Sequence, residues 1–291
     1  MPGLVERLRE HGRPTFSFEF FPPSDEAGIQ QLIGTVDALG PLRPDWVSVT
    51  YGATGAARYK TFSAVGAIRG QTDVRTMGHL TVAGQTTDEV RRALASYARL
   101  GVTHILALRG DPVDGERFVP HPDGLANATE LVRLAKASGD FTVGVAAFPD
   151  VHPEGSAEQD ARLLLAKQEA GAEFAITQLF FSVDAYVRLV ERFRALGGTM
   201  PIIAGIMPVT VPSQIERFAH LSGARMPAHV EARLRAAADD RERFREVGIE
   251  LMTGLADDVL AAGAPGLQFF TLNRSKATAE ILQRLRVLPV R

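Results

Sequence analysis

The chain has 291 residues, of which 45% are hydrophobic and 23% are charged, and this composition excludes a disordered or fibrous protein. Its 32 basic and 34 acidic residues give a formal net charge of -2 without any basic tract, so nucleic acid is not an expected partner. The lack of cysteine excludes disulfides, thiolate nucleophiles and cysteine-ligated metal sites. The N-terminus is charged and no apolar run reaches about 18 residues, so we expect a cytoplasmic protein without a membrane partner.

Eight short runs rich in β-branched and aromatic residues recur along the chain, which is typical of strands. They cover residues 15–21, 46–51, 76–82, 104–109, 141–148, 174–180, 201–207 and 266–272. Between them the apolar period becomes helical, as in residues 89–100, where one apolar stripe is followed by Gly101. Alternating strands and helices predict a parallel sheet, and eight such units in a chain of this length favour a closed (β/α)8 TIM barrel.

The interval between the seventh and eighth runs is about twice the usual length for this fold. Residues 225–240 within it are charged and helical in pattern, with Pro227 near the start, so we predict a helix inserted between these two strands. No linker rich in serine and glycine interrupts the chain, and residues 1–291 are expected to form one catalytic barrel domain. No Gly-x-Gly-x-x-Gly motif follows the first run, which disfavours an open dinucleotide-binding sheet.

The first predicted strand contains a glutamate in an unusual place. Glu19 lies between Phe18 and Phe20, and Pro22 and Pro23 then end the strand. An ionised carboxylate is costly away from water, so an unpaired Glu19 should have a raised pKa and keep its proton near neutral pH. Such a group can act as a general acid. A structural carboxylate paired with an arginine is the alternative that this segment leaves open.

Polar residues lie at or near the carboxyl ends of seven of the eight predicted strands. A TIM barrel gathers its active-site groups at that end. The residues are Glu19, Thr50, Tyr51, His79, Thr81, Arg109, Gly110, Asp111, Asp150, His152, Gln178, Thr271, Asn273 and Arg274.

Structural alternatives stay open for several of these residues. Thr50 is also explained as an ordinary strand residue, His79 as a satisfied barrel histidine, and Arg109 with Asp111 as a mutual ion pair. Gly110 between the last two permits close approach of a ligand to the backbone, as an anion or a flat polar ring would require.

Other catalytic classes have little support in the pattern. There is no His-Glu-x-x-His motif and no Gly-x-Ser-x-Gly motif, so we expect neither a metal centre nor a serine nucleophile. Acid catalysis by Glu19 remains, beside hydrogen-bonding groups suited to a planar heterocyclic cofactor.

Eight motifs, in order along the chain, resemble those of the methylenetetrahydrofolate reductase family in its short bacterial form. They are FSFEFFPP (16–23), VSVTYGA (47–53), HLTVAGQ (79–85), LALRGDP (106–112), GVAAFPDVHPEG (144–155), GAEFAITQLFF (171–181), IMPVT (206–210) and FFTLNRS (269–275). The resemblance implies a TIM barrel enzyme that binds FAD and reduces 5,10-methylenetetrahydrofolate to 5-methyltetrahydrofolate with NADH or NADPH. It also implies a ping-pong scheme, in which the nicotinamide leaves before the folate enters, and a homo-oligomer that is a dimer or a tetramer.

The resemblance also implies roles for individual residues. Glu19 matches the general acid that protonates N10 of the folate, and Asp111 matches an aspartate that lies near the flavin, tunes it and bonds the pterin. The matching substrate-binding residues are Glu19, Asp111, Gln178, Gln214, Phe218, Leu272 and Arg274. The matching FAD-binding residues are Thr50, His79, Arg109, Gly110, Asp111, Ala128, His152, Asp160 and Lys167.

Two of these matches carry further detail. Arg109 and Lys167 supply the cations expected for the pyrophosphate. Phe218 matches an aromatic that stacks on the nicotinamide, on one helical face with Gln214, although without the resemblance a core phenylalanine would be the simpler interpretation.

Three positions depart from the family pattern: Asn127 and Phe148 stand where tyrosines are usual, and Leu163 stands where a polar residue is common. Loss of these polar groups predicts loosely held FAD. A flavin-independent direct hydride transfer from NADH to the same folate is therefore the alternative reaction. A non-enzymatic folate-binding or flavin-storage barrel is the alternative outside catalysis.

Overall fold

The computed structural model describes residues 4–9, 13–52, 55–111, 118–152, 155–216 and 225–285. Within these residues eight parallel strands close into a barrel in chain order, which confirms the predicted (β/α)8 fold. The strands are β1 (Thr15–Phe20), β2 (Trp46–Val49), β3 (Thr76–Thr81), β4 (His104–Leu108), β5 (Thr142–Ala147), β6 (Phe174–Thr177), β7 (Ile202–Ile206) and β8 (Gly266–Phe270).

Helices alternate with the strands as the sequence predicts. They are α1 (Leu4–Arg9), α2 (Glu26–Leu39), α3 (Gly55–Gln71), α4 (Thr87–Arg99), α5 (Ala128–Ser138), α6 (Ala157–Glu169), α7 (Val183–Ala195), α9 (Ala228–Arg235), α10 (Arg241–Ala261) and α11 (Lys276–Arg284), with a short 3₁₀ helix η1 (Gly40–Leu42) after α2. The predicted inserted helix is α9, which begins after Pro227 and precedes the long α10. None of the helices in the described part of the chain is long and apolar enough to span a membrane.

The last strand ends earlier than predicted. We expected residues 266–272, but β8 stops at Phe270 because the backbone turns sharply after it. Leu272 and Asn273 adopt left-handed conformations, with φ of 52° and 58°, which a strand does not accommodate. The amide of Arg274 then donates to the carbonyl of Thr271 at 3.0 Å and closes a turn. Arg274 therefore leaves the barrel on a tight turn rather than on an extended strand.

Short local signals begin the helices. Asp25 accepts from the amide of Gly28 at 2.8 Å at the start of α2. Asn127 accepts from the amide of Glu130 at 3.1 Å at the start of α5. Both side chains satisfy an amide that the first helical turn leaves open. The asparagine that departs from the family pattern therefore has a capping role in this chain.

The chain divides into two compact units. We call residues 17–146 with 166–175 the β1–β5 unit, and residues 1–16, 147–165 and 176–291 the β7–β8 unit. The expectation of one catalytic domain over residues 1–291 stays a prediction.

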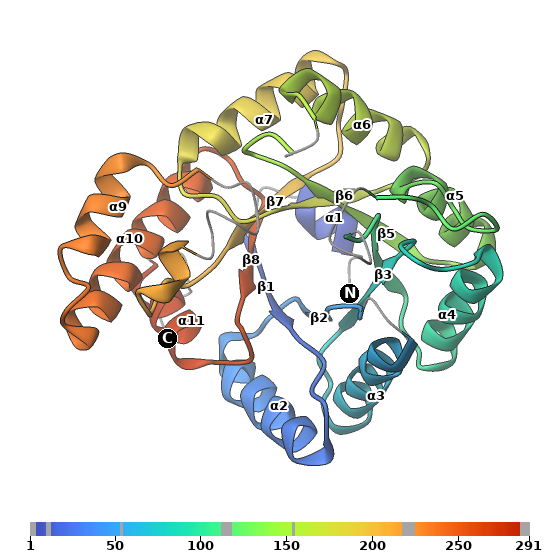
Figure 1. Cartoon of the computed structure of the whole chain (residues 1–291), viewed down its shortest axis with the longest axis horizontal. Coiled ribbons are helices and arrows are strands. Elements are labelled where there is room, and N and C mark those ends of the chain that lie inside the picture. Colours follow the sequence, from blue (N-terminus) through green and yellow to red (C-terminus); the bar gives the residue numbers. More distant parts are fainter. Residues whose placement is uncertain are drawn as a thin grey trace. The chain divides into compact units, whose positions relative to one another are not determined.

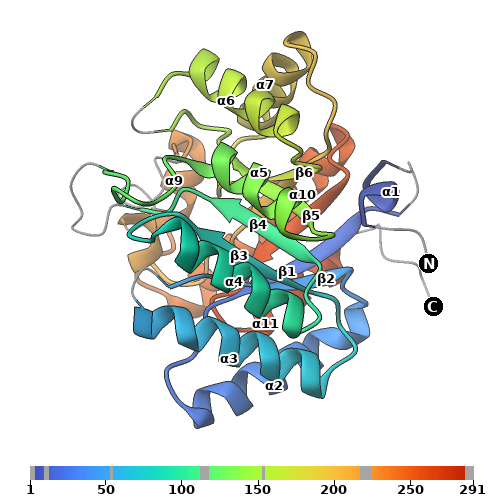
Figure 2. The ribbon, with the colours of Figure 1, turned by 90° about the vertical axis from the view of Figure 1, so that its right-hand side faces the viewer.

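The β1–β5 unit places its helices outside its strands (Figure 1). α2 packs beside α3, and α4 packs beside α5 (Figure 2). α3 and α4 both contact β3, whose residues are buried along its whole length. Tyr97 of α4 reaches this strand and donates its hydroxyl to the carbonyl of His79 at 2.6 Å. Helix α4 thus holds the backbone at one of the predicted site residues.

Gly78 allows this close packing, because a Cβ at that position would collide with the ring of Tyr97. We expect Gly78→Ala to lower the free energy of unfolding by about 1–3 kcal/mol, since a buried ring must shift. Gly34→Ala is the matched control, because Gly34 lies on the exposed side of α2 with open space around it. This control should raise the stability by about 0.5–1 kcal/mol. Urea unfolding measures both, and equal values for the two variants would contradict the packing assigned to Tyr97.

Candidate active site

Glu19 and His79 come together inside the β1–β5 unit. Ser48 of β2 pairs with Glu19 on one side and with Met77 on the other. His79 lies two residues beyond Met77, so its side chain points to the same face of the sheet as that of Met77. Glu19 Oε2 lies 3.7 Å from His79 Nε2, and the two side chains are only 13% and 4% exposed.

This pair is close enough for an ion pair, but the histidine is uncharged. Burial lowers the pKa of His79 to about 3, so its imidazole is neutral at pH 7. A neutral ring supplies no positive charge that would favour an ionised Glu19. Nε2 also has no hydrogen-bond partner among the residues that the structure describes. A buried nitrogen without a partner is suited to a ligand, while the assignment of His79 to FAD stays a prediction.

The segment after β4 has a fixed backbone. The carbonyl of Arg109 accepts from the amides of Val82 and Ala83 at 3.1 and 3.0 Å. Gly110 has φ of 85°, and a Cβ there would lie 2.8 Å from Ala83 Cβ and 2.9 Å from Thr81 Cβ. Glycine is therefore required both by conformation and by space. Residues 81–83 therefore contact this segment both through hydrogen bonds and through close packing.

The side chains of this segment differ in exposure. The Arg109 guanidinium lies over the ring of Phe118, with Cζ 4.8 Å from the ring centroid, and its Nε donates to the carbonyl of Gly110 at 3.4 Å. This cation-π contact orients the guanidinium. Asp111 is exposed at the end of the segment. A cation held in place next to an exposed carboxylate can bind groups of both charges.

Three further predicted FAD-binding residues belong to the same unit. Thr50 is half-buried directly after β2, and its amide donates to the carbonyl of Phe20 at 2.9 Å. Ala128 is the buried first residue of α5. Lys167 of α6 donates its ammonium group to the carbonyl of Ala146 in β5 at 3.1 Å. Thr50 and Lys167 are each held by a hydrogen bond to a backbone carbonyl, and Ala128 is held by burial.

In the β7–β8 unit, His152 and Asp160 lie together. The carboxylate of Asp160 accepts from the amide of His152 at 2.8 Å. The His152 ring meets the edge of the Phe148 ring at a centroid distance of 4.8 Å and an interplanar angle of 87°. Phe148 therefore retains an aromatic contact although it lacks the usual hydroxyl. Leu163, the third departure, is 47% exposed on α6.

The predicted substrate residues of this unit have different surroundings. Gln178 is half-buried, and its Oε1 accepts from the amide of Leu179 at 2.8 Å. Leu272 is 38% exposed and Arg274 is exposed, both in the turn after β8. Phe218 lies outside the described residues.

Gln214 has a structural role that the sequence did not indicate. Its Oε1 accepts from the amides of Thr210 and Val211 at 2.7 and 3.0 Å, and its Nε2 donates to the carbonyl of Pro208 at 3.1 Å. The side chain is buried and holds the loop that follows β7. Its predicted contact with substrate stays a prediction, beside this observed role.

Sequence reasoning also missed Arg58, and it quoted Gln85 only as part of a motif. Arg58 contacts the loop between β3 and α4, and Gln85 lies within that loop and bonds the end of β3. Contacts of an arginine with distant carbonyl groups leave no periodic signal. Only the HLTVAGQ motif (79–85) indicates from sequence that this loop has a functional role.

A family model described as methylenetetrahydrofolate reductase matches residues 4–286. The chain belongs to the methylenetetrahydrofolate reductase family. The 5,10-methylenetetrahydrofolate reductase of Escherichia coli (strain K12) is 37% identical over 290 residues, which cover 98% of this chain and 96% of that protein. Methylenetetrahydrofolate reductase 1 of Schizosaccharomyces pombe is 35% identical over 278 residues, which cover 94% of this chain and 46% of the longer protein.

A solved structure shares the fold. An uncharacterised protein from Clostridium thermocellum, described as binding two copies of 5-methyl-5,6,7,8-tetrahydrofolic acid, superposes with a TM-score of 0.65 and covers 96% of each chain. At 16% sequence identity this likeness extends to the architecture alone.

In this member of the methylenetetrahydrofolate reductase family, the neutral His79 makes stability depend on pH. The ordinary histidine pKa is 6.5 and the folded value is about 3, so between them the unfolded chain binds a proton that the folded chain does not. The contribution of the neutral His79 to the free energy of unfolding is fully present above about pH 6.5 and is lost as the pH decreases toward 3. His79→Gln should reduce the slope of unfolding free energy against pH by up to about 1.4 kcal/mol per unit.

Denaturant unfolding at several pH values between about 4 and 6 measures this slope. His229→Gln is the control, because His229 is exposed on α9 and should leave the slope unchanged. An unaltered slope in His79→Gln would mean that His79 already titrates freely in the folded protein.

Proposed function

We propose that this protein reduces 5,10-methylenetetrahydrofolate to 5-methyltetrahydrofolate, with FAD as cofactor and NADH or NADPH as reductant. One observation supports this above the others: the carboxyl group of Glu19, which is only 13% exposed, lies 3.7 Å from an uncharged histidine in a chain of this family. Reduction of the folate requires an acid, whereas mere retention of a folate or a flavin does not.

Glu19 is the proposed acid. The bond between the methylene carbon and N10 of the folate breaks, its electron pair goes to N10, and the Glu19 carboxyl supplies the proton. A neutral amine is a far better leaving group than its anion, so the proton lowers the barrier to ring opening. The remaining N5 iminium can then accept a hydride. This step needs a protonated Glu19 carboxyl, and the neutral His79 beside it adds no positive charge that would oppose protonation.

The described residues fit a flavin dinucleotide. The buried His79 Nε2 lacks a hydrogen-bond partner among the described residues, and the Arg109 guanidinium is held beside the exposed Asp111. When bound, the flavin supplies a carrier that accepts a hydride from the nicotinamide and gives it to the folate. The residues that would hold it are Thr50, His79, Arg109, Gly110, Asp111, Ala128, His152, Asp160 and Lys167, with Arg109 and Lys167 serving the pyrophosphate.

The substrates use groups at the ends of other strands. Asp111 is proposed to accept a hydrogen bond from the pterin while its charge tunes the flavin. Gln178 is proposed to bind both substrates in turn, and Leu272 and Arg274 to bind substrate. Gln214 and Phe218 are proposed for the nicotinamide side, in keeping with the family resemblance.

Glu19→Gln should separate the two half-reactions. The variant keeps the shape of the side chain but has no acidic proton, so folate reduction should fall by about 10²–10⁴-fold. Oxidation of NADH with a quinone acceptor needs no such proton and should stay near the wild-type rate. Stopped-flow measurement of each half-reaction gives the two rates.

Glu26→Gln is the control for this substitution. Glu26 is exposed in the first turn of α2 and accepts a hydrogen bond from Gln30 at 3.0 Å. It should leave both half-reactions unchanged. If Glu19→Gln slowed NADH oxidation as much as folate reduction, Glu19 would not be the acid of the folate step.

The role of FAD has its own test. Protein saturated with FAD should be yellow, lose its flavin absorption under anaerobic NADH, and regain it when 5,10-methylenetetrahydrofolate is added. Full activity in colourless protein that takes up no FAD would instead support direct hydride transfer. The departures at Asn127, Phe148 and Leu163 motivate this comparison, although Asn127 and Phe148 have other roles in the structure. Ligand binding without turnover would favour the storage barrel.

A further inference from the structure

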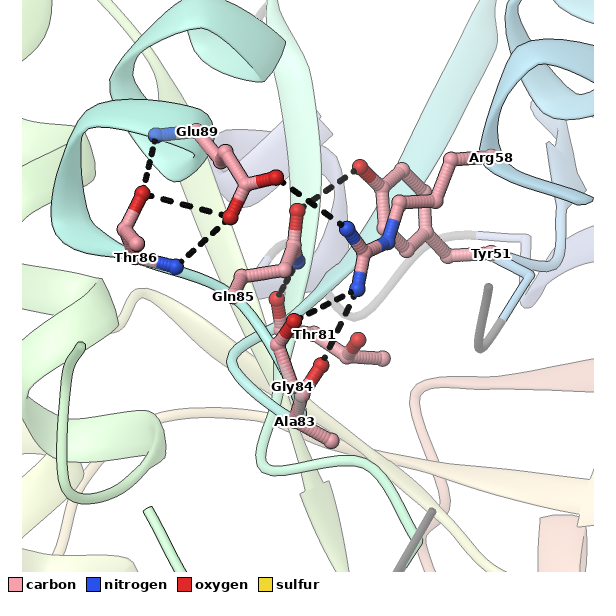
Figure 3. Close-up of polar contacts among 8 residues, drawn as sticks. All are labelled: Tyr51, Arg58, Thr81, Ala83, Gly84, Gln85, Thr86 and Glu89. Atoms are coloured by element: carbon pink, nitrogen blue, oxygen red, sulfur yellow. Dashed lines mark hydrogen bonds and ion pairs between the residues drawn. The ribbon is translucent and has the colours of Figure 1, made fainter. Parts of the chain in front are cut away.

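The loop between β3 and α4, residues 82–86, is held by side chains from two other elements (Figure 3). Arg58 reaches it from α3, and Tyr51 reaches it from the end of β2. We call residues 82–86 the β3–α4 loop. The whole arrangement lies within the β1–β5 unit.

Arg58 binds the backbone of this loop. One guanidinium nitrogen donates to the carbonyl of Ala83 at 3.3 Å and to that of Gly84 at 3.0 Å. Gly84 has φ of 61°, so its carbonyl is turned out of the path of an extended chain. Hydrogen bonds from a charged donor are stronger than those from a neutral one. Arg58 therefore stabilises the turn itself.

A second contact holds the other end of the loop. The hydroxyl of Tyr51 donates to Gln85 Oε1 at 3.3 Å, and Gln85 Nε2 donates to the carbonyl of Thr81 at 2.5 Å. Gln85 is 1% exposed. Burial raises the pKa of Tyr51 to about 12, so its hydroxyl keeps its proton as a donor at neutral pH. The side chain of Gln85 thus closes the loop over the end of β3.

The opposite side of the loop contacts two segments: Arg109 and Gly110, which are proposed to bind FAD, and residues 123–124, which lead to α5. The amides of Val82 and Ala83 donate to the carbonyl of Arg109, directly before Gly110. On the way to α5, a Cβ at Gly124 would collide with the carbonyl oxygen of Gln85, so these backbones touch. The amide of Thr87 donates to the carbonyl of Asp123 at 2.9 Å. The position of the loop therefore determines where both segments lie.

We infer that Arg58 is a positioning residue for the cofactor site, acting through the β3–α4 loop on the Arg109–Gly110 backbone. Its two carbonyl contacts fix the turn whose amides hold Arg109. This inference rests on the proposed function, because Arg109 and Gly110 are assigned to FAD there. Arg58 itself is not assigned a contact with the cofactor.

The carbonyl contacts matter more here than the ion pair of Arg58. Its other guanidinium nitrogen lies 3.8 Å from Glu89, whose side chain is 40% exposed. Glu89 already accepts from the amide of Thr86 at 2.8 Å in the capping box of α4, and this hydrogen bond is the main reason why its pKa is lowered. Long and exposed ion pairs contribute little. Removing the charge of Glu89 should therefore spare the loop.

The test compares four variants in cofactor-free protein and in FAD titrations. Arg58→Met removes all donors, and Arg58→Lys keeps the charge but not the planar group. Glu89→Gln removes the ion pair. Arg91→Met is the matched control for Arg58→Met, because Arg91 of α4 forms an exposed ion pair with Asp88 at 2.9 Å and does not bond the loop in the described part of the chain. Hydrogen exchange at the amides of Val82 and Ala83 reports on the loop, and FAD fluorescence quenching reports on affinity.

We expect Arg58→Met to speed exchange at these two amides by about tenfold or more, and to raise the FAD dissociation constant about tenfold. Amides in β1 and β2 should exchange as in the wild type. Arg58→Lys should give a partial effect, and Glu89→Gln and Arg91→Met none.

Three results would overturn the inference. Unchanged exchange in Arg58→Met would show that the loop does not depend on Arg58. Faster exchange at both amides with unchanged FAD affinity would show that the loop does not position the cofactor segments. Faster exchange throughout the β1–β5 unit would show that Arg58 stabilises the whole unit and does not position the loop specifically. A wild-type protein that takes up no FAD would instead overturn the proposed function, and the cofactor part of this inference with it.

Discussion

The chemistry proposed for this protein depends on a carboxyl group of low exposure, Glu19, beside an uncharged imidazole. Glu19 and His79 approach because Ser48 of the strand between them sets the register of both neighbours. Burial keeps the imidazole neutral, so it places no positive charge beside Glu19. A parallel barrel can support such a pair because the strands hold both side chains by their backbones.

The surrounding structure serves to keep this region in place. Tyr97 binds the carbonyl of His79 from outside the sheet, and Gly78 leaves the space for its ring. Arg58 holds the neighbouring loop, whose amides at Val82 and Ala83 donate to the carbonyl of Arg109. Each contact is a hydrogen bond to backbone, so what is positioned is the chain path rather than one side chain. Such support is typical of sites that need accurate placement of groups.

Periodic patterns predicted most of the fold, including the eight strands, the barrel and the helix at Ala228–Arg235. Individual site residues such as Glu19 and His79 were also visible, but their contact was not, because strand register joins residues far apart in sequence. The asparagine cap of α5 could have been recognised from Asn127 and the glutamate three residues later, yet it was interpreted only as a family departure. Arg58 left no pattern at all.

The most direct test of the central claim is the protonation state of the Glu19 carboxyl in the complex with oxidised FAD and 5,10-methylenetetrahydrofolate at neutral pH. Infrared difference spectra of the wild type and a variant in which Glu19 is replaced would isolate its C=O band. A band of a protonated carboxyl group that disappears with the substitution is the predicted result. A carboxylate band in its place, with no protonated band, would contradict the account.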